Sequence, residues 1–200
     1  MTQARTRLDR TAVLCGAREV LDRTGLDGFT TRALATHLQV RQPGLYWHFP
    51  TKADLLSALA ADILEREHHA SLPEPGEGWE AFLMRNARSF RTALHAVRDG
   101  ARLHAGYHRR LCSESSNLSE APSQQIRLLV NQGFEEHSAI SALIAISRYT
   151  VGVVLEEQAG VRDDIDKTDN DGCCCKVGAV GRPAWNNQVH GHLLRSAVPS

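Results

Sequence analysis

The stretch FTTRALATHLQVRQPGLYWHFPT, residues 29–51, decides the fold of this chain. Its first part predicts a short helix over about residues 31–38, because Leu34 and Leu38 fall on one face of such a helix. Thr30 stands directly before it, where a threonine hydroxyl accepts a hydrogen bond from the unpaired amides of the first turn. We therefore expect Thr30 to be the N-cap of this helix.

The second part of the stretch predicts another short helix, over about residues 42–48. Pro43 is compatible with that helix only in its first turn, where its missing N–H has no helical partner in any case. Two short helices joined by a link as brief as 39–41 are typical of a helix-turn-helix, whose second helix enters the DNA major groove. That second helix would project large side chains with polar tips: Gln42, Tyr46, Trp47 and His48.

Charge is unevenly distributed along the chain. The 200 residues carry 23 lysines and arginines and 23 acidic residues, so the formal charge is zero. Within residues 1–52, however, eight basic side chains stand against four acidic ones. A basic end on a neutral chain is the electrostatic footprint of a phosphate-binding module, although a solvated basic face would have the same composition.

Several classes of protein are excluded by pattern. No uninterrupted apolar run approaches the roughly 18 residues of a membrane span, and the N-terminus lacks the apolar core of a signal peptide. Five cysteines, three of them adjacent at 173–175, form neither a disulfide framework nor the paired spacing of a zinc site. No nucleophile–base motif or glycine-rich phosphate loop is visible. We expect a cytoplasmic protein that is not an enzyme and has no membrane partner.

Apolar side chains recur at helical spacing in the rest of the chain. Residues 8–23 carry one apolar stripe that stops at Gly25, and Cys15 within it is expected to be a small core or boundary residue rather than a reactive thiol. Thr51 and Asp54 have the spacing of a capping box at the start of a long connecting helix. Further helices are expected from Trp79 to about residue 97, over 124–132 and over 138–157, with 112–123 as a loop. No strand pattern appears, so the predicted class is all-α.

The predicted architecture is an N-terminal three-helix helix-turn-helix DNA-binding domain plus a C-terminal helical domain. The expected divisions are a helix-turn-helix domain over 1–52, a connecting helix over 53–70, the helical second domain over 71–160 and an atypical tail over 161–200. The tail is acid-rich and then rich in Gly, Cys and Pro, without apolar periodicity, and is expected to be disordered.

Beyond these patterns, the chain resembles the tetracycline repressor branch of the TetR family. The resemblance rests on TTRALATHL (30–38), QPGLYWHF (42–49), RDGARLH (98–104) and VLEEQ (154–158), and it spans residues 8–158. It implies that the C-terminal helical domain is a ligand-binding and dimerisation domain, and that the chain is a homodimer that binds a palindromic double-stranded operator beside a regulated gene. It also implies a small-molecule inducer in each C-terminal domain that releases the DNA.

In the head, the resemblance places Thr31, Arg32, Gln42, Pro43 and Tyr46 at operator-contacting positions, with Trp47, His48 and Lys52 beside them. The chemistry of these side chains agrees. Arg32 can bind guanine O6 and N7 as a fork, and Gln42 can read adenine N6 and N7. Tyr46 and Lys52 suit phosphate groups.

In the second domain, the resemblance implies a ligand site formed by His68, Asn86, Phe90, His104, Gln125 and Glu156. Each residue alone has an ordinary structural explanation, but together they offer amide donors, a ring for stacking and an imidazole to an oxygen-rich polycyclic ligand. The family has no intrinsic cofactor. The resemblance implies that Mg²⁺ would arrive with a tetracycline-like ligand and be held by His104, with the glutamate of the partner subunit acting through water. One imidazole suits Mg²⁺ only because the ligand supplies most of the oxygens.

This chain departs from the family pattern at several positions. Arg41 and Gly44 stand where tetracycline repressors usually have an acid and a threonine, so a different operator sequence is expected. Residues 107–109 replace the turn that moves on induction, which leaves another aromatic polyketide as an alternative ligand to tetracycline–Mg. The family's next long helix, which completes a four-helix dimer interface, is not visible in 161–200. The alternative function is therefore a constitutive or dimerisation-impaired DNA-binding remnant.

Overall fold

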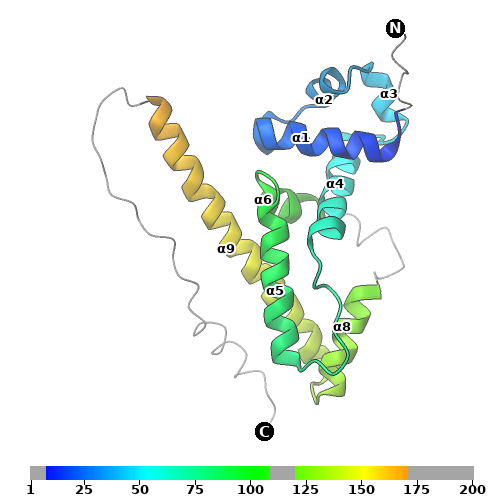
Figure 1. The fold of residues 1–200 in the computed structure, drawn as a ribbon, viewed down its shortest axis with the longest axis vertical. Coiled ribbons are helices and arrows are strands. Elements are labelled where there is room, and N and C mark those ends of the chain that lie inside the picture. Colours follow the sequence, from blue (N-terminus) through cyan, green and yellow to red (C-terminus); the bar gives the residue numbers. More distant parts are fainter. Residues whose placement is uncertain (1–7, 109–119, 171–200) are drawn as a thin grey trace.

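The computed structural model describes residues 8–108 and 120–170, and every element in this part of the chain is helical (Figure 1). The predicted all-α class is confirmed. The elements are α1 (Arg10–Gly28), α2 (Thr31–His37), α3 (Gln42–Tyr46), α4 (Lys52–Glu67), α5 (Trp79–His95), α6 (Gly100–Leu103), the π-helical turn η1 (His104–His108), α8 (Glu120–Asn131) and α9 (Glu136–Asn170).

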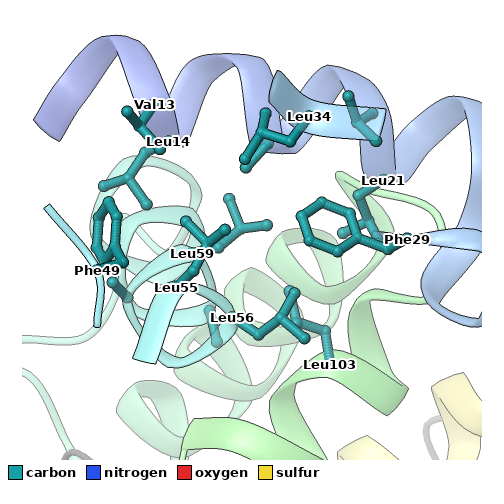
Figure 2. Packing of buried hydrophobic residues seen from close by; sticks show 14 of the residues in the cluster. Val13, Leu14, Leu21, Phe29, Leu34, Phe49, Leu55, Leu56, Leu59 and Leu103 are labelled. Atoms are coloured by element: carbon teal, nitrogen blue, oxygen red, sulfur yellow. The ribbon is translucent and has the colours of Figure 1, made fainter. Parts of the chain in front are cut away.

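The head consists of α1, α2 and α3 packed on the first turns of α4. Its core contains Leu21, Phe29, Leu34 and Leu55, none of them more than 1% exposed (Figure 2). Leu103 of α6 projects into the same core, although it is distant in sequence (Figure 2). The head core therefore extends past the division expected at residue 52 and includes a side chain of the second domain.

Local signals in the sequence fix the ends of the head helices. The Thr30 hydroxyl accepts from Ala33 N at 3.0 Å and caps α2 as predicted. Thr51 and Asp54 form the predicted capping box, each side chain accepting from the other residue's amide at 3.1 Å. Gly25 has a φ of 67°, a conformation that costs glycine little, and it interrupts α1 before the last turn of that helix.

Three expectations from the sequence differ from the structure. The recognition helix α3 ends at Tyr46, because Phe49 turns inward to the head core. Helix α8 begins at Glu120, inside the predicted loop, since Pro122 is tolerated in a first helical turn. Cys15 is exposed and lies neither in the core nor at its boundary, because it is on the side of α1 opposite the core-facing Ala17.

The second domain is built on α5, α8 and α9, with α6 and η1 between it and the head (Figure 1). Phe82 and Leu83 of α5 pack with Leu129 of α8 and Phe134 in one cluster. Farther along α5, Phe90 and Leu94 pack with Ala101 of α6 and Val154 of α9 in a second one. Helix α5 thus forms the centre of this domain.

Helix α9 is longer than predicted. It continues ten residues past Gly160, where the disordered tail was expected to begin, and reaches Asn170. A helix that is already nucleated can add residues without an apolar stripe, because each addition gains one hydrogen bond. The other thirty residues of the predicted tail, 171–200, lie outside the described part of the chain.

The stretch Glu136–Gly160 of α9 is also long and apolar enough, by length and composition, to cross a membrane. Arg148 and several serines interrupt its apolar side chains, but the mean hydropathy of the stretch remains high, at 1.7. Only 17% of the most apolar 18 residues of this stretch are buried within the chain. A helix of this kind is equally expected in a soluble protein that packs one of its sides against a second subunit.

Candidate functional site

The head presents the predicted DNA-facing side chains on α2 and α3. Arg32, Pro43 and Trp47 are exposed, and Trp47 is 90% accessible to solvent. The buried Leu45 fastens α3 to the head core from the opposite side. The recognition helix therefore offers its solvent side to a groove while one leucine anchors it.

Gln42 connects the two helices of the motif through hydrogen bonds. Its Nε2 atom donates to Thr31 Oγ1 at 2.9 Å and to the Tyr46 hydroxyl at 3.1 Å. Both amide hydrogens are thus directed at protein oxygens, and Oε1 remains the atom that can accept from a base. Thr31, Gln42 and Tyr46, three of the predicted DNA-contacting residues, are therefore joined by hydrogen bonds.

Lys52 and His48 have structural contacts that the sequence did not predict. The Lys52 ammonium donates to the Phe29 carbonyl at 2.6 Å and so braces the entry to α2. The His48 carbonyl accepts from Arg10 at 3.2 Å, and the Arg10 guanidinium lies 4.2 Å from the centre of the Phe49 ring. Arg10 was missed, because a basic residue at the start of α1 carries no signal that it reaches α3.

In the second domain, three predicted ligand residues form an aromatic row. The His68 and Phe90 ring centroids are 5.6 Å apart with the planes inclined at 48°. His104 packs edge-on against Phe90, with centroids 5.1 Å apart and planes at 72°. The row joins the end of α4, the middle of α5 and the start of η1.

His68 is held in a neutral state by its surroundings. Burial, together with a smaller contribution from the neighbouring His69, lowers its pKa from the ordinary 6.5 to about 4. Its Nδ1 lies 3.0 Å from Ser89 Oγ, which also accepts from Ala70 N at 3.2 Å. Ser89 was not among the predicted residues; its only sequence signal is a hydroxyl on the inner side of α5 beside Phe90.

The two predicted amides bind backbone just beyond His68. Asn86 Nδ2 donates to the Ala70 carbonyl at 3.0 Å, and Gln125 Nε2 donates to the Ser71 carbonyl at 2.6 Å. Five of the six predicted ligand residues are thereby connected, directly or through this segment. They come from α4, α5, η1 and α8.

Glu156 is not part of this group. It is exposed on α9, whereas the next residue, Glu157, binds Arg91 and His95 of α5 at 2.7 Å each. Burial opposes the charge on Glu157, but the hydrogen bonds from Arg91 and His95 outweigh it and lower its pKa. The expectation that Glu156 acts on a partner subunit's ligand stays a prediction.

The aromatic row is physically connected to the head. The turn η1 begins at His104, and its Tyr107 carbonyl accepts from Ser57 of α4 at 3.1 Å. On the preceding helix, Arg102 binds both carboxylate oxygens of Asp27 in α1 at 2.8 and 3.0 Å. A displacement of His104 would therefore be transmitted to α4 and α1 through direct contacts.

In residues 8–108 and 120–170, no three His, Cys, Asp or Glu side chains come together as a metal site. A cation near His104 would consequently need most of its ligands from elsewhere. A polycyclic molecule with several oxygens is one such source, because Mg²⁺ prefers oxygen ligands.

Comparison with known proteins gives matches over both domains. A family model described as "Bacterial regulatory proteins, tetR family" matches residues 13–59, and one described as "Tetracyclin repressor-like, C-terminal domain" matches residues 72–181. The chain is 47% identical over 158 residues to the tetracycline repressor protein class A from transposon 1721 of Escherichia coli, which covers 79% of this chain and 71% of that protein.

Solved structures match as well. TetR from Acinetobacter baumannii AYE is similar with a TM-score of 0.69 and 44% identity, over 83% of this chain and 88% of the other. TetR(class A) in complex with 5a,6-anhydrotetracycline and magnesium is similar with a TM-score of 0.69 and 43% identity, over 80% and 87% of the two chains.

Proposed function

The chain belongs to the TetR family of bacterial transcriptional regulators, and from this premise we propose that it represses a gene by binding a palindromic operator as a dimer. A small polycyclic ligand bound by the second domain releases the operator. The proposal rests on the aromatic row of His68, Phe90 and His104. The amides of Asn86 and Gln125 lie beside this row, and η1 connects it directly to the helix-turn-helix domain. Similar proteins include tetracycline repressor proteins, which supports a regulator rather than an enzyme, and we propose that it acts in the cytoplasm.

The DNA contacts follow from the chemistry of the exposed head residues. Arg32 binds a guanine through O6 and N7, the commonest specific contact in the major groove. Gln42 accepts from the exocyclic amino group of adenine through Oε1, because Thr31 and Tyr46 hold its amide in place. Pro43, Tyr46, Trp47, His48 and Lys52 add apolar and phosphate contacts around these two.

Arg32→Ala tests this assignment. The loss of one bidentate contact costs about 1–3 kcal/mol of operator binding and relaxes the preference at one base position. The measurement is affinity across a panel of single-base operator variants, with Arg66→Ala on α4 as a control that removes an arginine far from α3. Unchanged affinity across the panel would refute the assignment.

The ligand is a planar molecule with oxygens along one edge. Phe90 supplies a ring for stacking, Asn86 and Gln125 supply amide groups, and His104 supplies one nitrogen to a Mg²⁺ ion carried by the ligand. Tetracycline with Mg²⁺ is the first candidate, because a structure similar to this chain holds an anhydrotetracycline with magnesium. Another aromatic polyketide is the alternative ligand.

Release of the operator proceeds through the contacts between η1, α4 and α1. A ligand that draws His104 toward its metal strains the turn His104–His108, and the Ser57–Tyr107 bond passes this strain to α4. Since α4 forms part of the head core, its displacement changes where α3 sits. Two heads then no longer match two half-sites one helical turn apart.

Isothermal titration with tetracycline and Mg²⁺ tests the ligand directly. We expect saturable binding that depends on Mg²⁺ and is lost in His104→Ala, while operator binding without ligand is retained. Absence of binding at high micromolar tetracycline would exclude the drug and leave other polyketides to be tested in the same assay.

A further inference from the structure

Three successive backbone carbonyls between α4 and α5 are each held by a side chain. Asn86 donates to Ala70 O at 3.0 Å, Gln125 to Ser71 O at 2.6 Å and Arg85 to Leu72 O at 2.9 Å. We call residues 70–72 the strap. It runs between α5 and α8, and it has no helical or strand hydrogen bonds of its own (Figure 1).

Two of the three donors belong to the proposed ligand site. An amide that turns toward a ligand oxygen withdraws from its carbonyl, and a buried carbonyl without a partner is costly. Ala70 is 7% exposed, so water does not readily replace the lost donor at that residue. Ligand binding through Asn86 and Gln125 therefore tends to loosen the strap from which His68 extends.

The third donor is not part of that site. Arg85 binds Leu72 O and, with the same guanidinium, both oxygens of Glu77, from Nε at 2.8 Å and from Nη2 at 2.6 Å. Its Nη1 lies 3.4 Å from Glu74 Oε1. The hydrogen bond from Arg85 lowers the pKa of Glu77, in keeping with a charged pair at neutral pH. Arg85 thus clamps the strap and the loop that follows it onto α5.

The far end of that loop is also fastened. Gln132, directly after α8, donates to the Glu77 carbonyl at 2.9 Å and accepts from Trp79 N at 2.8 Å. The Pro and Gly content of residues 71–78 is typical of a linker between domains, and the structure shows that this segment is tied to α5 and α8. With both ends of the segment held, a change at the strap cannot be absorbed by free movement of the loop.

We propose that Arg85 is a positioning residue for the ligand site. It keeps the strap in place while Asn86 and Gln125 transfer their donors from the Ala70 and Ser71 carbonyls to the ligand. The His68 ring then stays against Phe90 when the ligand binds. This inference rests on the proposed function, because it assumes that Asn86 and Gln125 contact the ligand.

The test compares the rate of ligand dissociation in Arg85→Ala with that of the wild-type chain, using tetracycline with Mg²⁺ and its fluorescence as the probe. We expect dissociation about tenfold faster, since Arg85 is the donor that still holds the strap in the bound state, whereas Asn86 and Gln125 also hold it in the ligand-free state. Operator affinity without ligand should stay the same. Arg66→Ala, which removes the Arg66–Asp62 ion pair on α4, is the matched control and should change neither value.

Arg85→Lys and Glu77→Ala separate positioning from simple stability. A lysine ammonium cannot reach Leu72 O and both Glu77 oxygens in one planar fork, so Arg85→Lys should restore the dissociation rate only in part. Because Arg85 acts together with Glu77, the double variant Arg85→Ala/Glu77→Ala should be no faster than Arg85→Ala alone. Additive effects would overturn the proposal.

The other outcomes also decide the matter. A dissociation rate in Arg85→Ala equal to that of the wild-type chain overturns the positioning role. Loss of operator binding in the same variant, together with a lowered helical circular dichroism signal, assigns Arg85 to overall folding and also overturns it. If the wild-type chain binds operator but no tetracycline, the ligand proposal fails first. Failure of the ligand proposal can be told apart from failure of the Arg85 proposal, because it is seen with the wild-type chain before any variant is made.

Discussion

Leu103→Ala is expected to destabilise the head although Leu103 belongs to the second domain. The side chain is 1% exposed and packs among Leu56 and the other head-core residues (Figure 2). The substitution removes three carbon atoms, which at roughly 0.8 kcal/mol each gives about 2.4 kcal/mol of lost burial. A residual cavity adds to this, because Leu103 sits in a short helix that can close the gap only partly. We expect a total loss of about 3 kcal/mol.

Urea unfolding followed by far-UV circular dichroism and tryptophan fluorescence measures this loss. Trp47 lies in the head and Trp79 in the second domain, so fluorescence samples both. Because one core crosses the domain division, the two signals should change in a single transition, shifted to lower urea in the variant. Leu72→Ala is the matched control; its side chain is 46% exposed, and it should cost less than about 0.5 kcal/mol.

A loss of less than about 1 kcal/mol in Leu103→Ala would refute the reasoning, since truncation of a fully buried leucine costs about 2–5 kcal/mol. It would mean that α6 does not complete the head core. The path proposed for operator release would then lose one of its contacts. Two separate transitions in the wild-type chain would refute the shared core directly.

Three further outcomes follow from the structure. In Gly100→Ala, a Cβ would overlap the Leu94 carbonyl oxygen, so the free energy of unfolding should fall by about 3 kcal/mol or more. The control is Gly160→Ala, which should cost nothing measurable because a Cβ there meets nothing within 4 Å. Thr51→Ala removes the cap of α4 and should cost about 1 kcal/mol in the same urea assay; no loss would contradict the capping box. Burial lowers the pKa of His68 to about 4, so the unfolded chain takes up a proton below about pH 6.5 while the folded chain does not. Stability should therefore be full above pH 6.5 and fall toward pH 4, and His68→Asn should lose less between pH 7.5 and pH 5 than the wild-type chain.

Much of the head could be predicted from the sequence because its signals are local. Thr30 before an apolar stripe, Pro43 in a first turn and Thr51 three residues before Asp54 each specify a helix end within one turn of chain. Periodicity likewise predicted an all-α class, since an amphipathic helix repeats its apolar side chains over a few residues. Such features need no information about what the segment packs against.

The partners of these segments were decided by the tertiary structure alone. Leu103 in the head core and Lys52 on the Phe29 carbonyl both join segments that are distant along the chain, and no local pattern specifies such contacts. Nothing in the local sequence indicates that Arg85 binds the Leu72 carbonyl or that residues 71–78 are tied to α5. Only the folded chain brings three side-chain donors to three consecutive carbonyls, because α5 and α8 meet around that segment. Sequence determined which helices form and where most of them begin; packing between distant helices determined which polar groups are available to a ligand and which are already used to hold the backbone.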